Sequence, residues 1–431
     1  MPSRLRFWVI ADDLTGALDT AAPFAARGWR TCVVPWPGSS RQALPAAVRR
    51  ASDGHDVVVI ETASRHLAAR EAARRVRAVV AAAHRVDRNT ARPRAFYKKI
   101  DSTLRGNVAA ELAAFRAATG TACLPLAPAF PAHGRTTRAG AVWVHDVPLA
   151  RSAAARDALG PALSGDLARL APPGALDVFD AGTDADLRRI ATRLGRESRL
   201  GAVVGSGGLA AAIAARFGSA PPPTARHRLG AVHAGVATGA ARAGVLVVSG
   251  SAHPAAQAQA RALVAAGALG LVVAVDPRTS RQDRRATEAL ALAALAAGRP
   301  VVLVCPAIAA GSRLPAARAM AAARRLAATT RPLVTAGAVA AVFTVGGDTT
   351  AALVAAMGWA PLAVEGALVP GVAVVRLKPA GRGTPSSPRQ LAGPRWLITK
   401  SGAFGDPDTL RRLVRRLTAG RRPRMASTMT T

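Results

Sequence analysis

Cysteine is scarce in this chain, and the three cysteines lie far apart. Cys32, Cys123 and Cys305 are odd in number, and no two of them have C-x-x-C spacing. A disulfide framework or a zinc knuckle needs paired or closely spaced cysteines, so the sequence argues against both. The same usage is typical of a protein from the reducing cytoplasm.

Long hydrophobic runs are also absent. The longest uncharged apolar stretch, residues 300–311, is broken by Gly and Pro and is shorter than the roughly 18 residues that a membrane-spanning helix needs. The apolar run 7–11 ends on two aspartates and is too short for a secretory signal. With 50% hydrophobic residues among 431, the chain can bury large cores in two or three domains. We therefore expect a soluble cytoplasmic protein that does not bind membranes.

Lysine and aromatic residues are rare, although the chain is strongly basic. Only four of its 58 basic residues are lysines, and the formal net charge is +33. Such a charge raises nucleic-acid binding as a function. However, the arginines are spread along the chain apart from a cluster at 411–424, and 4% aromatic residues leave little material for stacking on bases. The composition disfavours nucleic acid as the main partner and favours attraction of small anionic substrates.

Valine-rich runs of strand length alternate with alanine-rich stretches of helix length. The runs lie at 7–11, 56–61, 95–100, 201–206, 244–250, 269–276, 299–305 and 341–347. Between two of them, Val76, Val79, Val80 and Ala83 recur at the helical period. This alternation is typical of α/β folds. It predicts two domains, each a largely parallel sheet flanked by helices.

The alternation stops between residues 220 and 243. Pro221, Pro222 and Pro223 lead there into a Gly/Ala stretch without periodicity, which predicts an interdomain linker. The predicted domains are therefore residues 1–219 and 244–415. Residues 416–431 have the composition of a disordered basic tail.

The first candidate site is the segment ADDLTGALDTA at 11–21. A strand of buried type ends directly on Asp12 and Asp13, and ligands of open α/β sheets bind outside the carboxyl ends of strands. Two carboxylates there can hold sugar hydroxyls, act as a base, or hold a metal through water. The alternative is that one aspartate only caps the following helix.

The second candidate is YKKIDSTLRGNVAAEL at 97–112. Another strand ends there on Lys99, Asp101 and Ser102, and Arg105 follows near the start of a predicted helix. Ser102 could cap that helix, and Glu111 could be an ordinary surface charge on it. Arg105 is poorly placed for the helix dipole but well placed to bind a carboxylate or phosphate through two hydrogen bonds. The segment therefore predicts an anion site.

The third candidate is the segment at 126–140, rich in proline, glycine and small residues, which predicts a loop. His133 and Arg135 are expected at its tip. A lone histidine in a loop is usually solvated. We therefore expect a solvated His133, with contact to the substrate as the alternative.

The second domain repeats a strand, a Gly/Ser turn and a helix three times. The turns are 249–251, 346–349 and 400–405, and glycines in such turns let a phosphate approach the backbone and the helix-start N–H groups. No GxxxxGK[ST] loop is present, and GxGxxG does not occur in Rossmann context. Three such turns in one domain predict a nucleotide site, with Lys400 and Asp348 available to it.

In this order, ADDLTGALDTA, KKIDSTLRGN, APAFP, GRTT, GSGGLA, VVSGS, GGDT and KSGAFG resemble the motifs of the four-carbon acid sugar kinase family. The resemblance covers about residues 6–410. It implies an N-terminal domain that binds a sugar acid such as 3-oxo-tetronate, erythronate or threonate, and a C-terminal domain that binds ATP. It further implies phosphorylation of the terminal hydroxyl of the acid, with Mg²⁺ bridging the nucleotide phosphates. A homo-oligomer is compatible with it.

The resemblance also assigns residues. The sugar-acid side comprises Asp12, Asp13, Lys99, Asp101, Ser102 and Arg105. The nucleotide side comprises Ser249, Ser251, Gly346, Gly347, Asp348, Thr349, Gly402 and Gly405. Asp348, Asp12 and Asp13 are the expected catalytic residues, with the general base left open among them and Asp101, and the metal ligands unassigned. The chain departs from the family pattern at Ala63, at Asp157-Ala158 and at Asp146, which bears on the substrate.

Two alternatives stay open at this point. One is a nucleic-acid- or polyanion-binding protein on a decayed kinase scaffold. The other is a sugar kinase with a different acceptor.

Overall fold

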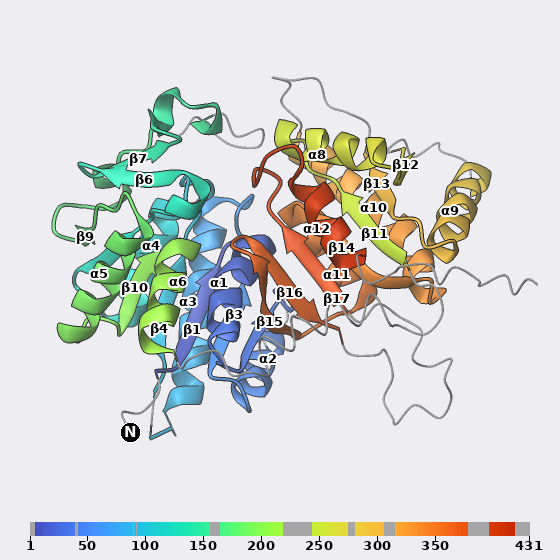
Figure 1. Cartoon of the computed structure of the whole chain (residues 1–431). Coiled ribbons are helices and arrows are strands. Elements are labelled where there is room, and N and C mark those ends of the chain that lie inside the picture. The colour runs from blue at the N-terminus through green and yellow to red at the C-terminus, as the bar shows by residue number, and fades with distance from the viewer. Residues whose placement is uncertain are drawn as a thin grey trace, which may run out of the picture.

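The computed structural model describes residues 5–38, 42–88, 90–91, 93–155, 164–218, 244–274, 281–305, 315–377 and 396–418. These residues form an α/β fold with a mostly parallel sheet of 14 described strands and a separate three-stranded sheet (Figure 1). Within these ranges, no helix combines the length and the apolar character needed to cross a bilayer. The predicted fold class is confirmed.

Residues 5–218 form the first half, which is built on parallel strands. In sheet order these are β2 (Thr31–Val34), β3 (Val57–Glu61), β1 (Phe7–Ala11), β4 (Ala95–Lys99), β10 (Ala202–Gly205), β5 (Leu124–Ala127) and β9 (Leu176–Val178). The helices are α1 (Leu14–Ala26), α2 (Ala43–Ser52), α3 (Ala69–Asp87), α4 (Val108–Thr119), α5 (Asp184–Arg196) and α6 (Gly207–Phe217). The small sheet contains β6 (Arg135–Arg138), β7 (Ala141–Val144) and β8 (Val147–Pro148).

Strand β1 shows how the sequence places the helices on both faces of this sheet. Phe7 and Val9 pack in one core with residues of α1, α5 and α6, whereas Trp8 and Ile10 pack in another with residues of α2, α3 and α4. Successive side chains of a strand point to opposite faces. A strand covered on both faces therefore needs an uninterrupted apolar run, and FWVIA supplies it.

The second half repeats this plan. Its parallel strands, in sheet order, are β12 (Leu269–Val272), β13 (Val301–Val304), β11 (Gly244–Ser249), β14 (Val339–Val345) and β17 (Trp396–Lys400). The helices are α8 (Pro254–Ala265), α9 (Arg281–Ala296), α10 (Ala316–Thr335), α11 (Gly347–Met357) and α12 (Thr409–Thr418).

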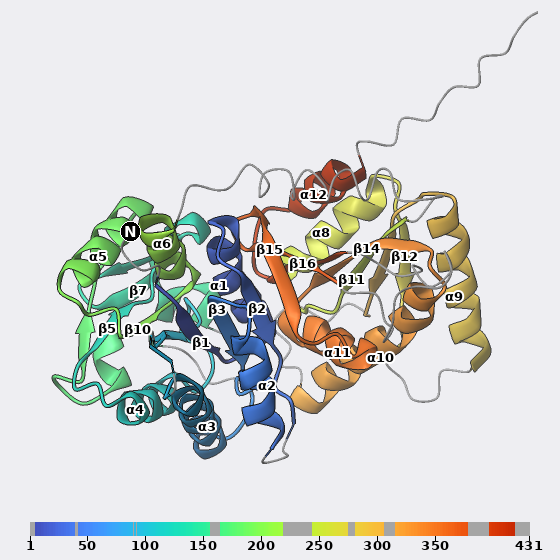
Figure 2. The same cartoon turned by 90° about the horizontal axis from the view of Figure 1, so that it is seen from below.

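Two antiparallel strands join the halves. β15 (Leu362–Val369) pairs with β2 of the first half, and β16 (Val372–Arg376) pairs with β15 and with β17 of the second half. Both views show β15 and β16 between the two halves (Figures 1 and 2). The sequence predicted two separate sheets, and this hairpin makes them one.

The hairpin also reverses the strand direction, so β14 runs nominally opposite to β1. Neighbouring strands rotate by roughly 20–25°, and the sheet order from β1 to β14 passes through β3, β2, β15, β16 and β17. Over these steps the rotation accumulates to roughly 120–150°, which turns β14 back towards the direction of β1. The carboxyl ends of the two parallel sets can therefore face a common site.

The structure bears out the predicted strands and the helical face after His66. Each predicted run contains a strand, and Val76, Val79, Val80 and Ala83 are all buried on α3. Three expectations were wrong. The loop at 126–140 contains a 3-10 helix (Pro131–His133) and strand β6, Glu111 is buried, and α12 continues to Thr418, into the predicted tail. The predicted linker 220–243 and residues 419–431 lie outside the described residues.

Candidate functional site

The polar candidates of the first half follow three neighbouring strands. β3, β1 and β4 lie side by side in parallel, and the chain continues from their carboxyl ends to Arg65, to Asp12 and Asp13, and to Asp101. Since the carboxyl ends of parallel strands share one edge of the sheet, these side chains meet where open α/β sheets bind ligands. The structure thus joins the first two candidate motifs in one site.

Arg65 lies at the centre of this edge, although the sequence analysis did not single it out. Its Nε donates to Asp12 Oδ2 at 2.8 Å, and its Nη2 donates to Asp12 Oδ1 at 3.0 Å. The same Nη2 donates to Asp13 Oδ1 at 2.9 Å and lies 3.7 Å from Asp101 Oδ1. Arg65 follows β3, so the strand-end argument that found the aspartates would have found it too.

The two neighbouring aspartates have different roles. Burial opposes ionisation of Asp12, but the charge and hydrogen bonds of Arg65 outweigh it and lower the pKa. Burial raises the pKa of Asp13, with a further contribution from the charge of Asp12. Asp13 also caps α1, because its Oδ1 accepts from Gly16 N at 3.0 Å. The capping alternative therefore holds for Asp13, in addition to its contact with Arg65.

In the described structure, the guanidinium group of Arg105 is already bound by a carboxylate of the protein. Its Nε and Nη2 donate to Asp101 Oδ2 and Oδ1 at 2.9 and 2.7 Å. Although Asp101 is buried, the Arg105 charge holds its pKa well below the ordinary value. The helix begins at Val108, with Asn107 as its N-cap residue, so the alternative that Ser102 or Thr103 caps it does not hold. Ser102 lies half-buried in the turn between Asp101 and Arg105.

The two adjacent lysines of β4 point to different surroundings. Lys98 is fully buried and pairs with Glu111 Oε2 at 2.8 Å, which explains why Glu111 is not a surface charge. Glu111 also accepts from Ser64 Oγ at 2.5 Å, next to Arg65. Lys99 lies on the other face, where its Nζ is 2.8 Å from the position that a Cβ on Gly16 would take. Lys99 is thus at the start of α1, beside the aspartates.

The three glycine turns of the second half also lie side by side, because β11, β14 and β17 are neighbours. A Cβ on Gly402 would collide with Ser251 Oγ, and a Cβ on Gly250 would collide with Thr349 Oγ1. A Cβ on Gly346 would lie 3.4 Å from Ser251 Cβ. The φ of Gly346 is +108°, a conformation that favours glycine. Ser249 ends β11 beside them, whereas Gly405 serves the turn into α12.

The start of α11 has no side-chain cap, a feature that it shares with the starts of α2, α3, α4 and α10. Side chains of Asp13, Ser206 and His253 cap α1, α6 and α8, whereas Gly346 offers α11 no side-chain cap. Uncapped N–H groups at a helix start, together with the helix dipole, attract anions. This start also lies against the first half, since a Cβ on Gly347 would be 2.9 Å from Asp13 Oδ2.

A second contact between the halves involves Asp348. Its Oδ1 lies 3.6 Å from His66 Nε2, and the hydrogen bond to His66 lowers its pKa. The Asp348 side chain is 48% exposed, which makes it the accessible carboxylate of this region. The two halves therefore already meet at the predicted catalytic residues.

Positively charged residues of both halves lie near His253, at the start of α8. Burial lowers the pKa of His253, and the nearby charges of Arg105, Lys400 and Arg135 lower it further. Burial also lowers the pKa of Lys400 to about 7. His133 is not solvated as expected, because its ring stacks on Phe130 at 3.9 Å and lies 4.6 Å from Phe404. Burial lowers its pKa to about 4, so it is neutral at physiological pH.

Within the described residues, no three His, Cys, Asp or Glu side chains are grouped so as to hold a metal ion by themselves. Mg²⁺ is usually bound through one or two carboxylates together with substrate phosphates. Asp348, at the uncapped start of α11, could supply such a carboxylate.

Comparison with known proteins agrees with this division of the site. Residues 7–173 match the family described as the sugar-binding N-terminal domain, and residues 246–410 match the nucleotide-binding C-terminal domain. The D-threonate kinase of Bordetella bronchiseptica is 34% identical over 425 residues, which is 93% of this chain and 95% of that protein. The chain belongs to the four-carbon acid sugar kinase family.

A second relative of this family covers almost the whole chain. The D-threonate kinase of Cupriavidus necator is 33% identical over 96% of this chain and 99% of its own length. The crystal structure of a Haemophilus influenzae protein has the same fold, with a TM-score of 0.60 at 20% identity, and covers 94% of this chain and 98% of that one. Family membership favours an enzyme over the nucleic-acid-binding alternative.

Two of the departures from the family pattern have a visible backbone basis. Ala63 has a φ of +48°, and Asp146 has a φ of +61°, a region that L residues rarely adopt. Glycine would take this conformation without strain. The pair Asp157-Ala158 lies outside the described residues.

Proposed function

We propose that this kinase transfers a phosphoryl group from ATP to the terminal hydroxyl of a four-carbon sugar acid. The proposal rests on one observation: the candidate site of the first half is in contact with the candidate site of the second half. The uncapped start of α11 lies against Asp13, which belongs to the carboxylate and arginine group of the first half. Phosphoryl transfer requires mainly positioning and charge neutralisation, and this arrangement supplies both.

The carboxylate of the sugar acid would be bound beside Arg105 and Arg135. The charge of Arg105 and burial lower the pKa of Arg135, so the two guanidinium groups lie close in a partly desolvated place. Arg105 is bound to Asp101, whereas the described contact of Arg135 is to the neutral backbone oxygen of His133. An anion there would offset the repulsion. Lys99, at the start of α1, would add a third positive charge.

Asp13 is the residue that we assign as general base. Both of its donors, Gly16 N and Arg65 Nη2, bind Oδ1, whereas Oδ2 faces Gly347 at the start of α11. Its raised pKa makes it a better proton acceptor than Asp12 or Asp101, whose pKa values are lowered. Asp12 would then be a positioning residue, since both of its oxygens hold Arg65.

The nucleotide phosphates would lie over the turn 346–349, flanked by Ser251 and Lys400. The glycines leave the backbone accessible. The first N–H groups of α11 and the positive end of its helix dipole both lie at this turn. Asp348 would hold Mg²⁺, and the bound ion would supply positive charge for the transfer. Asp348 keeps a low pKa through His66, so it is ionised and able to hold a cation at neutral pH.

The acceptor that we place first is D-threonate. Both relatives that align over nearly the whole chain are D-threonate kinases. The test is an assay of ADP release with ATP, Mg²⁺ and a panel of four-carbon acids that includes both threonate enantiomers, erythronate and 3-oxo-tetronate. We expect D-threonate to give the highest kcat/KM, with the phosphate on the terminal oxygen by ³¹P NMR. Thermal stabilisation by Mg-ATP without turnover of any of these acids would contradict the proposal.

Asp348→Asn separates the nucleotide side from the sugar side. The variant should lose most of kcat and still bind the sugar acid by calorimetry, because Asp348 faces the α11 start. Asp408→Asn is the matched control, because Asp408 is a surface carboxylate of the same half that pairs with Arg411. A variant at position 348 that loses sugar-acid binding but keeps ATP binding would mean that the two sides are assigned the wrong way round.

A further inference from the structure

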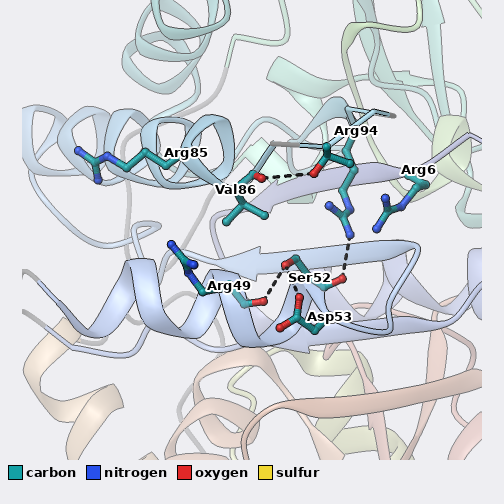
Figure 3. Close-up of a pocket in the computed structure, with 8 residues that line it drawn as sticks. Arg6, Arg49, Ser52, Asp53, Arg85, Val86 and Arg94 are labelled. Carbon is teal, nitrogen blue, oxygen red and sulfur yellow. Dashed lines mark hydrogen bonds between the residues drawn. The ribbon is translucent and has the colours of Figure 1, made fainter. Parts of the chain in front are cut away.

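A second cavity lies at the opposite end of the strands from the candidate active site. It has a volume of about 230 Å³ and is lined by Arg6, Arg49, Ser52, Asp53, Arg85, Val86, Thr90 and Arg94 (Figure 3). Arg6 directly precedes β1 and Arg94 directly precedes β4, whereas Asp12 and Asp101 follow these strands. Five strand residues separate the two ends, roughly 16 Å at 3.3 Å per residue. The cavity is therefore separate from the kinase site.

Arg94 is the buried anchor of this cavity. Its side chain is 1% exposed, and its Nη1 pairs with Asp87 Oδ1 at 3.2 Å. Its Nη2 donates to the carbonyl oxygens of Ser52 and His55, both at 3.0 Å. Among the described residues, its buried Nε has no hydrogen-bond partner. The guanidinium group also lies over the Trp8 ring, 4.5 Å from its centroid. A buried N–H of a charged group that stays unpaired is costly, so an acceptor oxygen that reached the Nε would remove this cost.

The other arginines of the cavity add charge that the protein does not neutralise. Within the described ranges, Arg6, Arg49 and Arg85 form no ion pair, and Arg6 lies close enough to lower the pKa of Arg94 by repulsion. Figure 3 shows Arg6 and Arg94 side by side, with Arg49 on α2 and Arg85 on α3. Asp53 is the carboxylate of the lining. Four guanidinium groups lie against two carboxylates, Asp53 of the lining and the Asp87 that pairs with Arg94, so the cavity keeps a net positive charge.

A purely structural role explains part of this cluster. α2 and α3 both end here, and cations are favourable near helix C-termini. Arg94 fulfils that role by binding the carbonyl oxygen of Ser52, the last residue of α2. The role does not account for the unpaired Nε of Arg94, nor for Arg6, which belongs to neither helix.

We propose that this cavity is a second anion site, which binds a multiply charged phosphate-type anion through the guanidinium groups of Arg6, Arg49, Arg85 and Arg94. Arginine forks match phosphate oxygens in paired hydrogen bonds, and several guanidinium groups favour a multivalent ion over a single carboxylate. Ser52 and Thr90 add hydroxyl groups to the lining. Inorganic phosphate and a phosphate monoester share this chemistry.

The test is calorimetric titration of the full chain with inorganic phosphate at constant ionic strength. The parent should bind phosphate at two classes of site, one of them the kinase site. The double variant Arg49→Ala/Arg85→Ala should weaken one class at least tenfold and leave the other unchanged. Both residues are exposed, so the variant should fold. A parallel titration with glycerol 3-phosphate distinguishes free phosphate from a phosphate monoester as the preferred ligand.

The matched control is Arg50→Ala/Arg77→Ala. These exposed arginines lie on the same two helices outside the cavity, and the change in net charge is the same. The control should titrate like the parent. Equal isotherms for the two double variants, or a single class of phosphate site in the parent, would overturn the proposal. If circular dichroism shows that the double variant is misfolded, Arg85→Gln alone gives the same readout.

Discussion

The two roles of Asp13, helix cap and proton acceptor, can be separated by two substitutions at one position. Asp13 caps α1 through Gly16 N and binds Arg65, and its Oδ2 faces the start of α11. Asparagine caps helices about as well as aspartate and keeps an acceptor oxygen for Arg65, but it cannot take up a proton. Alanine loses the cap, the acceptor and the carboxylate together.

Asp13→Asn should therefore reduce kcat by about a hundred- to ten-thousandfold, the usual contribution of a general base, with a Tm close to that of the parent. Asp13→Ala should lose a similar part of kcat and also about 1 kcal/mol of stability for the cap. For a domain of this size that corresponds to a Tm lower by roughly 2–4 °C. The kinetics come from the ADP-release assay under saturating ATP and sugar acid, and Tm comes from circular dichroism.

The outcome that refutes the reasoning is specific. If Asp13→Asn keeps kcat within threefold of the parent while Asp13→Ala loses stability, Asp13 is only a helix cap. The base would then have to be sought among the other carboxylates that the sequence left open.

Three further outcomes follow from the structure. Gly347→Val should abolish ATP binding by calorimetry and preserve sugar-acid binding, because the side chain would block the approach of a phosphate to the backbone at the start of α11; native ATP affinity would make the turn purely structural. Burial raises the pKa of Glu61 to about 7, so the folded state holds a proton that the unfolded state releases, and stability is lost as pH rises from about 4.5 through 7. Glu61→Gln should thus match the parent's Tm at pH 5 and exceed it at pH 8; an equal gap at both pH values would contradict this. Glu111→Ala leaves Lys98 buried without its ion-pair partner and should cost about 3–5 kcal/mol by denaturant unfolding. Glu197→Ala, at an exposed pair, should leave the stability nearly unchanged.

Local patterns were sufficient for the eight predicted strand runs and for most candidate residues, but not for the hairpin β15–β16. Strands covered on both faces need continuous apolar runs, so FWVIA and the other predicted runs can be recognised as strands from the sequence. Polar residues directly after such runs, as at Asp12 and Asp101, must lie at the carboxyl edge of the sheet. Glycine before a helix start marks the turn at Gly346, whose φ of +108° only glycine adopts easily.

Other features depend on residues that are distant in the sequence, and no local pattern contains them. Glu111 looks like a surface charge on a helix until β4 places Lys98 beneath it. From the sequence, Arg105 is expected to bind a ligand. In the structure its guanidinium group binds Asp101, four residues away in a non-helical turn. His133 looks solvated until Phe404 from the other half covers its ring.

The sequence by itself determined the α/β class, the division into two halves, and the residue types at each strand end, because each depends on short-range periodicity and chain order. The assignment of the first half to a sugar acid came from the resemblance of its motifs to a known family. The tertiary structure decided how the halves meet. The hairpin β15–β16 fuses the sheets, and the accumulated twist turns the second set of strand ends towards the first. Only then do Gly347 and Asp13, and Asp348 and His66, come into contact. Those contacts join residues hundreds of positions apart, and long-range packing alone fixes them.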